Sequence, residues 1–319
     1  MKGHFYVLTH AVIFEEPGVL HLADTALADP AGNDLVVESR WTGISTGTER
    51  LLWTGKMPNF PGMGYPLVPG YETVGEIVSA PTSLMHRIGE TVFVAGCGKY
   101  SDVRGLFGGS ASTLVVDSDK ALKVDASLKT QSVLMALAAT ACHALAAPGA
   151  NLPDLIVGNG VLGRLLARLT VALGGEPPTV WETNPARRTD DEAFRVVDPS
   201  EDEGARYATI FDVSGSADIL DQLVGHLVPG GEIVLAGFYS DRLSFAFPPA
   251  FMKEARLRVA AEWKPDDMEI VNRLLGEGLL SLDGLITHEH AAHDAAQAYE
   301  TAFSDAECLK MVLNWRETV

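Results

Sequence analysis

The sequence contains few cysteines and few basic residues. Its 319 residues include three cysteines, at positions 97, 142 and 308, which lie far apart and are odd in number. This spacing argues against a disulfide framework and favours a reducing compartment. Lys and Arg number 24 against 42 Asp and Glu, so the net charge is −18. Such an acidic chain is not expected to bind nucleic acid or anionic lipid, and its charge favours solubility.

Long hydrophobic runs are also missing. The longest nearly apolar stretch, residues 134–147, includes a histidine. It is shorter than the roughly 20 residues that span a bilayer. The first ten residues lack a basic segment followed by a long apolar one. We therefore expect no signal peptide, and a protein that stays in the cytoplasm.

Two different patterns divide the chain. The first 125 residues predict short strands at 36–39, 73–78, 91–94 and 112–116, with Gly and Pro clustered between them. This pattern favours a distorted barrel over a parallel sheet. From about residue 129 helices and strands alternate, which predicts a doubly wound parallel sheet. The helices expected there are 131–145, 161–173, 219–227, 266–278 and one after Asn184, and the strands are 155–157, 179–181, 207–213, 231–235 and 256–261. The last 40 residues predict one helix, 292–303, and one strand, 309–315, which we expect to return to the first domain.

A glycine fingerprint lies between the first of these strands and its helix. It consists of Gly158, Asn159, Gly160, Val161, Leu162 and Gly163. Glu182 ends the next predicted strand. This order is typical of a dinucleotide site, because glycines admit the pyrophosphate to a helix N-terminus and the acid accepts hydrogen bonds from the ribose.

The residues after the predicted strands indicate which cofactor is used. Glu182 favours NAD over NADP, since a carboxylate repels a 2′-phosphate. Arg187 and Arg188 follow closely and either weaken this preference or face solvent. Ligands bind at the carboxyl edge of such a sheet, so Ser214, Gly237 and Phe238 join the predicted cofactor site, the last two beside the nicotinamide.

The layout resembles the medium-chain dehydrogenase/reductase superfamily. The likeness rests on Pro69-Gly70-Tyr71-Glu72 before Val74-Gly75, on Gly89-Glu90-Thr91-Val92, on the late fingerprint and on residues 309–315. It implies a GroES-like distorted barrel as catalytic domain, a Rossmann domain and nicotinamide-dependent hydride transfer. We expect residues 1–128 and 265–319 in the GroES-like domain and 129–264 in the Rossmann domain.

Residues 41–55 and 60–72 carry a closer likeness. They resemble the bacteriochlorophyllide a dehydrogenase family of bacteriochlorophyll biosynthesis, an alcohol dehydrogenase family. The resemblance implies a tetrapyrrole substrate whose 3-(1-hydroxyethyl) group is oxidised to 3-acetyl with NAD. Superfamily members are commonly dimers or tetramers, so edge strands within residues 231–261 are candidates for pairing in a homodimer.

The zinc ligands of the superfamily are absent. The first ligand position holds Thr46 or Ser45, the second holds Tyr71, and the third falls near Ala136. Hydroxyl, phenol and methyl groups do not make a zinc site. Only Cys97 lies where the structural zinc lobe needs four cysteines. We therefore predict no metal at either place.

Without zinc, side chains must take the hydroxyl proton and polarise the oxygen. Thr48 matches the superfamily's proton-relay position, and Tyr71 replaces a ligand and is expected to donate to the oxyanion. Glu72, Glu49 and His143 are candidate bases. Each of these residues has a structural alternative. Tyr71 could fill the volume of the missing metal, and Glu72 could pair with a backbone group or with a distant Arg. Glu49 could cap a helix that begins near residue 51, Thr48 could hydrogen-bond to the nearby backbone, and His143 could simply pack in its helix.

Residues 51–65 suit a flat, apolar ring. They supply Trp53, Met57, Phe60, Met63 and Tyr65 among glycines and prolines. The alternative is that these side chains pack a lid on the barrel itself. Arg50 or Lys56 is a candidate partner for a propionate, or a plain surface charge.

Two other interpretations remain open. His288, His290 and His293 have spacing that can hold a metal, but they lie in a polar connection. The chain is alternatively a zinc-free quinone or enoyl reductase using NADPH, or a non-catalytic carrier that binds nicotinamide and pigment. Glu182 argues against the reductase, and turnover distinguishes the carrier from both enzymes.

Overall fold

The computed structural model describes residues 7–146, 149–189, 191 and 193–317. The chain forms two compact units, residues 1–136 with 283–319 (unit 1) and residues 137–282 (unit 2). Helix α2 (Met135–Leu145) leads from the first unit into the second.

The return to unit 1 comes later than the predicted boundary at residue 265. Helix α6 (Pro265–Gly276) belongs to unit 2. Its first turn is bonded to α2, because Nδ1 of His143 lies 2.9 Å from Oδ2 of Asp267. Arg168 then donates to the carbonyl of Ser281 at 3.0 Å. These contacts keep residues 265–282 with the parallel sheet.

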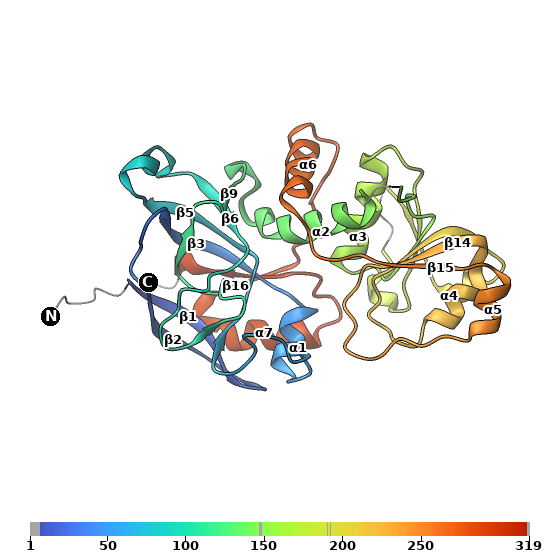
Figure 1. Ribbon diagram of the computed structural model, residues 1–319, viewed down its shortest axis with the longest axis horizontal. Helices are drawn as coiled ribbons and strands as arrows, with labels where there is room; N and C mark the ends of the chain where they lie inside the picture. The colour runs from blue at the N-terminus through green and yellow to red at the C-terminus, as the bar shows by residue number, and fades with distance from the viewer. Residues whose placement is uncertain (1–6, 147–148, 190, 192, 318–319) are drawn as a thin grey trace. The chain divides into compact units, whose positions relative to one another are not determined.

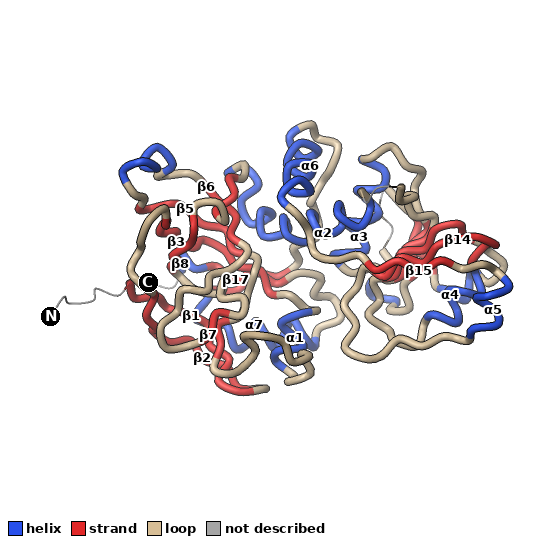
Figure 2. The backbone as a smooth tube through the Cα atoms, in the orientation of Figure 1, coloured by secondary structure: helices blue, strands red, loops and turns tan. Residues whose placement is uncertain are grey.

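Unit 1 is built from two sheets (Figures 1 and 2). One has the order β2-β1-β4-β7, and the other follows β16-β17-β3-β5-β6-β9 with β8 paired to β3. Most neighbours in chain order are antiparallel, as expected for a barrel-like β unit. The strands are β1 (Val7–Glu16), β2 (Val19–Leu27), β3 (Asp34–Ile44), β4 (Leu67–Val68), β5 (Thr73–Ser79), β6 (Thr91–Val94), β7 (Arg104–Gly105), β8 (Thr113–Asp117), β9 (Ala121–Lys123), β16 (His288–Ala291) and β17 (Met311–Asn314).

Two helices complete unit 1. Helix α1 (Thr48–Trp53) follows β3, and α7 (Ala295–Ser304) precedes β17. The buried residues of α7 recur at three- and four-residue intervals, at positions 295, 298, 299 and 302, so one face of the helix is apolar. That face packs in a core cluster with Phe14, Leu52 and Leu67, which joins both helices to the first sheet.

Unit 2 is a six-stranded parallel sheet in the order β12-β11-β10-β13-β14-β15. Its strands are β10 (Leu155–Val157), β11 (Thr179–Trp181), β12 (Arg195–Val197), β13 (Tyr207–Asp212), β14 (Leu227–Leu235) and β15 (Arg256–Val259), and its other helices are α3 (Val161–Ala172), α4 (Leu220–His226) and α5 (Phe247–Met252). The chain builds outward from β10 in both directions, which makes the carboxyl ends of β10 and β13 the switch point where ligands bind. The predicted doubly wound sheet is confirmed.

Several elements differ from the predictions. The helix expected after Asn184 is only a 3-10 turn, Pro185–Arg187. Arg164 explains this ending, because its guanidinium donates to the carbonyl of Arg187 at 3.3 Å and to Oγ1 of Thr189 at 2.8 Å. The helix expected from residue 131 begins at Met135, after a 3-10 stretch, Ala126–Leu134, in which Lys129 has a φ of 49°. Strands β1 and β2 were not predicted.

Candidate active site

Three hydroxyl groups meet in unit 1 where β3 ends and β5 begins. The phenol of Tyr71 donates to Oγ of Ser45 at 2.8 Å, and Oγ1 of Thr48 lies 3.5 Å from the same phenol. The backbone N–H of Thr48 also donates to Oγ of Ser45 at 3.3 Å. We call Ser45, Thr48 and Tyr71 the hydroxyl cluster. The structure thus brings together two predicted catalytic residues, and beside them lies Ser45, one of the two candidates for the first ligand position.

Tyr71 acts in this cluster as a donor. Its ring packs edge-on against Phe107, with centroids 5.4 Å apart. Burial, followed by the charge of Glu72, raises the pKa of Tyr71 above its ordinary value. The phenol therefore keeps its proton throughout the physiological pH range and can donate it in a hydrogen bond to a developing oxyanion.

Glu72 is fully buried and forms an ion pair that sequence reasoning missed. Oε2 of Glu72 lies 2.5 Å from Nζ of Lys310, and only 2% of Lys310 is exposed. The ammonium of Lys310 also donates to the carbonyl of Ile44 at 3.2 Å. Burial raises the pKa of Glu72, and Lys310 opposes that rise. The predicted partner of Glu72 was a backbone group or a distant Arg, and the structure supplies a distant Lys.

Glu49 is the second buried carboxyl of the site. It lies in the first turn of α1, where Oε2 accepts a 3.3 Å hydrogen bond from the backbone N–H of Ser45. Burial, and after it the charge of Glu72, raises the pKa of Glu49 to about 8, while Lys310 acts in the opposite direction. At neutral pH this carboxyl is therefore largely protonated, and it can gain or lose a proton near the working pH.

The fingerprint in unit 2 forms the glycine turn expected of a dinucleotide site. Gly158 has a φ of 108°, and Gly160 immediately precedes helix α3. A Cβ on Gly163 would lie only 1.9 Å from the carbonyl oxygen of Gly158, so the helix approaches the turn more closely than any side chain permits. Val161 and Leu162 form the first turn of α3. This cradle fits a dinucleotide, with the pyrophosphate at the N-terminus of α3.

The acid after β11 is held by backbone groups. Glu182 accepts hydrogen bonds from the N–H of Asn159 at 3.1 Å and from the N–H of Asn184 at 2.8 Å. These bonds hold the carboxylate beside the glycine turn, the position from which such an acid would bind a ribose. Arg188 is bonded to Asp198 at 3.0 Å. Among the described residues, none donates a hydrogen bond to the buried Oδ1 of Asn159.

The other residues predicted to bind the cofactor follow the carboxyl ends of β13 and β14. Ser214 donates its backbone N–H to Oδ1 of Asp212, the last residue of β13, at 2.9 Å. Gly237 donates its N–H to the carbonyl of Asp212 at 3.1 Å. Phe238 is half exposed, which leaves its ring available to a flat ligand. All three predicted residues therefore gather beside the switch point.

This chain is similar to a known domain family and to named dehydrogenases. Residues 31–126 match the model of the alcohol dehydrogenase GroES-like domain. The chain is 53% identical over 310 residues to 2-desacetyl-2-hydroxyethyl bacteriochlorophyllide A dehydrogenase of Rhodobacter capsulatus, covering 97% of this chain and 99% of that protein. It is 54% identical over 315 residues to the protein of the same name from Cereibacter sphaeroides, with the same coverage. The chain belongs to this dehydrogenase family.

Solved structures show the same fold at lower identity. An alcohol dehydrogenase of Escherichia coli CFT073 in complex with NADH has a TM-score of 0.83 and 21% identity, covering 97% of this chain and 99% of that one. A dehydrogenase of Sinorhizobium meliloti bound to NADP has a TM-score of 0.80 and 19% identity, with 97% and 99% covered. The predicted combination of GroES-like and Rossmann domains is confirmed. The chain is an alcohol dehydrogenase-type oxidoreductase of the medium-chain superfamily, which implies a nicotinamide cofactor.

The donors at the superfamily's metal position do not fit zinc. They are hydroxyl groups together with Glu72, whose carboxylate is already paired with an ammonium. Zinc prefers thiolate, imidazole or carboxylate ligands in a tetrahedral set. In the part of the chain that the structure describes, no three His, Cys, Asp or Glu residues come together in a way that could hold a metal. We derive no step through zinc.

The histidines have other contacts. His143 belongs to unit 2 and is bonded to Asp267, which caps α6 by accepting from the N–H of Lys264 at 2.7 Å. His288 lies 2.9 Å from Oγ1 of Thr287, and His293 lies 3.5 Å from Asp294. His143 thus has a structural partner, but His288 and His290 lie in strand β16 and not in the polar connection that was expected.

The five predicted substrate residues gather around one apolar cluster of unit 1. Met57 is buried in it, and Trp53, Phe60, Met63 and Tyr65 pack partly buried against it. The Tyr65 phenol donates to the carbonyl of Leu52, and Trp53 packs edge-on against Phe14 at 5.5 Å. These side chains therefore belong to the core of unit 1, and the four partly buried ones keep some exposed surface that a ligand could contact. Arg50 and Lys56 are exposed.

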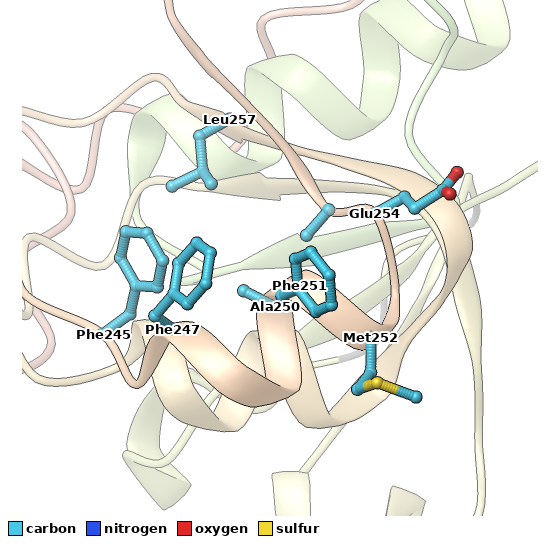
Figure 3. Close-up of a pocket in the computed structure, with 8 residues that line it drawn as sticks. Phe245, Phe247, Ala250, Phe251, Met252, Glu254 and Leu257 are labelled. Atoms are coloured by element: carbon cyan, nitrogen blue, oxygen red, sulfur yellow. The ribbon is translucent and has the colours of Figure 1, made fainter.

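A surface pocket of about 490 Å³ lies elsewhere, on unit 2 (Figure 3). Figure 3 shows side chains of α5 and the loop before it facing Leu257 of β15. Its apolar lining includes Phe245, Phe247 and Phe251. Sequence reasoning did not single out this pocket, which is not formed by the fingerprint. None of the helices in the described residues is both long and apolar enough to cross a membrane.

Proposed function

We propose that the chain oxidises the 3-(1-hydroxyethyl) group of a bacteriochlorophyllide to 3-acetyl, with NAD as acceptor and no catalytic metal. The observation that carries this proposal is the identity of 53–54% across 97% of the chain to enzymes named for that substrate. The product on this route is bacteriochlorophyllide a.

The hydroxyl cluster supports the metal-free part of the proposal. Bound NAD supplies an acceptor for the hydride that leaves the carbinol carbon. Tyr71 donates its hydrogen bond to the substrate oxygen and stabilises the negative charge that develops there. Thr48, which lies beside the phenol and is partly exposed, accepts the hydroxyl proton of the substrate while it donates its own proton to a solvent water. In the free protein the phenol donates to Oγ of Ser45 at 2.8 Å, so on substrate binding it turns its single proton to the substrate oxygen and accepts a hydrogen bond from the Ser45 hydroxyl instead.

The contacts of Glu182 support NAD over NADP. Its carboxylate is bonded to two backbone N–H groups beside the glycine turn, so it cannot easily turn away from a 2′-phosphate. Arg188 is paired with Asp198 and does not offset that charge. A substrate ring would use the exposed faces of Trp53, Phe60 and Met63.

A turnover assay tests the proposal. Metal-stripped protein is mixed with NAD and 3-(1-hydroxyethyl) bacteriochlorophyllide a, and NADH and the red shift of the acetyl product are followed. We expect turnover without added zinc and a preference for NAD. Tyr71→Phe removes one oxyanion donor and lowers kcat by roughly 100-fold. Tyr100→Phe is the matched control, because that phenol donates to the carbonyl of Gly108 in the same unit.

Each other outcome identifies an alternative. Pigment binding without turnover favours a carrier, and a preference for NADPH with a quinone or enoyl substrate favours the reductase. Activity that returns only with zinc overturns the metal-free mechanism.

We also propose that two copies pair along β15. This strand is the last of the six-stranded sheet, and its Leu257 and Val259 side chains are exposed beside the α5 pocket. An exposed apolar edge strand is a template for pairing with a second chain. Sedimentation velocity is expected to show a dimer that Val259→Lys converts to monomer. A wild-type monomer at micromolar concentration would contradict the pairing.

A further inference from the structure

Lys310 links the two segments that present the hydroxyl cluster. Its ammonium lies 2.5 Å from Oε2 of Glu72, which directly follows Tyr71 in the sequence. The same ammonium donates at 3.2 Å to the carbonyl of Ile44, which directly precedes Ser45. One side chain therefore binds the end of β3 to the segment before β5, and the two hydroxyls joined at 2.8 Å stand immediately beyond these two contacts.

The surroundings of this bridge leave it little freedom. The backbone N–H of Gly43 donates to the carbonyl of Glu72 at 2.9 Å. A Cβ on Gly43 would lie only 2.1 Å from Oε2 of Glu72, so the carboxylate rests against the bare backbone of β3. Lys310 itself is held just before β17, which pairs with the end of β3. A shift of the ammonium must therefore move the Ser45 or the Tyr71 segment.

The other titratable groups around the Lys310–Glu72 pair come from three elements. Glu49 faces the pair from α1, Tyr299 from α7, and Tyr71 from the segment before β5. Two carboxyls thus share one ammonium in a buried space. Removing the ammonium leaves Glu72 without its ion-pair partner, which a buried carboxylate does not tolerate.

We propose that Lys310 is a positioning residue for the hydroxyl cluster, acting through Ile44 on Ser45 and through Glu72 on Tyr71. The proposal rests on the proposed function, in which the cluster binds the substrate oxygen. A metal would orient its ligands by coordination. Hydroxyl donors lack that constraint, so the direction of their hydrogen bonds depends on the backbone that carries them. A misplacement of a reacting group by about 1 Å can lower the rate roughly 100-fold.

The first test combines two substitutions. Lys310→Met alone leaves Glu72 buried and unpaired, and this variant is at risk of failing to fold. Lys310→Met/Glu72→Gln removes both charges with side chains of similar size. We expect the double variant to recover the thermal midpoint but to keep kcat roughly 100-fold below wild type, with an unchanged KM for NAD. Lys99→Met is the matched control, because Lys99 is ion-paired with the buried Asp34 of the same unit.

The second test needs no turnover. Hydrogen exchange is followed by mass spectrometry at the amides of Gly43, Ser45 and Thr48, which donate to Glu72, Glu49 and Ser45 respectively. The double variant is expected to exchange these amides faster than wild type, while peptides of β10 and α3 are unchanged. Lys99→Met is expected to leave all of them as in wild type.

The combined outcomes separate the two proposals. Wild-type exchange or wild-type kcat in the double variant overturns the positioning role, since the pair would then contribute only to stability. If the wild-type protein itself does not turn over, the proposed function fails, and the exchange data still decide whether Lys310 orders the cluster.

Discussion

Gly43 offers the most direct test of how tightly the buried pair is packed. A methyl group at this position would lie 2.1 Å from Oε2 of Glu72 and 3.2 Å from Cβ and Cδ of the same side chain. The backbone of Gly43 is outside the left-handed region, so alanine brings no conformational strain of its own. We therefore expect the effect of Gly43→Ala to come from displacing the Glu72 carboxylate from its place beside Lys310.

The size of the effect follows from this displacement. Ordinary contact needs about 3.4 Å or more, so the carboxylate must move by more than about 1 Å, which breaks its 2.5 Å contact with the ammonium. Breaking a buried ion pair costs about 3–5 kcal/mol. At roughly 2–4 °C per kcal/mol for a unit of this size, the midpoint of unit 1 is expected to fall by about 10 °C.

Differential scanning calorimetry measures this fall. Gly98→Ala is the control, because a Cβ there meets nothing within 4 Å and the glycine is in the same unit. Gly43→Ala/Glu72→Asp shortens the acid and is expected to recover part of the loss. Equal midpoints for Gly43→Ala and Gly98→Ala would refute the packing argument.

Three further predictions concern Glu49, Glu182 and Arg164. The pKa of Glu49 is about 8 in the folded protein against 4.5 for the free side chain, so the folded state binds the extra proton and stability falls as pH rises through this window. Urea titrations at several pH values are expected to show that the free energy of unfolding falls by at most about 1.4 kcal/mol per pH unit in this window, and that Glu49→Gln removes this slope. Parallel plots of unfolding free energy against pH for wild type and Glu49→Gln would contradict the prediction. Glu182→Ala is expected to raise the KM for NAD about tenfold and weaken discrimination against NADP in initial rates, whereas an unchanged NAD/NADP ratio would exclude its role. Arg164→Met removes one of two donors to the carbonyl of Arg187, which also accepts from Nδ2 of Asn159 at 2.7 Å, and is expected to raise the KM for NAD with little change in kcat. A fall in kcat alone would count against a role in the cofactor loop.

The sequence predicted the parallel sheet well because its local patterns coincide with the final packing. The fully buried strand β10 is an apolar run, and the glycines after it need their close approach wherever the sheet lies. The position of Glu182 could be predicted for the same reason, since it follows the next strand along the chain after the glycine fingerprint. By contrast, the helix expected after Asn184 is absent from the described residues. The segment is instead held by hydrogen bonds from the guanidinium of Arg164, a tertiary contact that no local sequence pattern contains.

The candidate site was predicted only in part because its partners are distant in sequence. Tyr71 and Thr48 were proposed through family resemblance, and their proximity agrees with it. Lys310 gave no signal, because a lysine near a chain end usually lies at the surface. Its burial arises only when β17 pairs with β3, which places its ammonium beside a carbonyl 266 residues away.

The raised pKa values of Tyr71 and Glu49 indicate different chemical roles for these two residues. Tyr71 stays protonated because burial and the charge of Glu72 both oppose its ionisation, so its hydrogen bond to an oxyanion does not vary across the physiological pH range. Glu49 changes charge near pH 8, and its carboxyl contacts the backbone of Ser45, the residue that accepts from Tyr71. A pH dependence of kcat centred near 8 would therefore belong to Glu49 and reach the substrate through Ser45. In the proposed metal-free mechanism, the site separates a constant donor from a titrating acid, whereas a single zinc ion would combine polarisation with proton release.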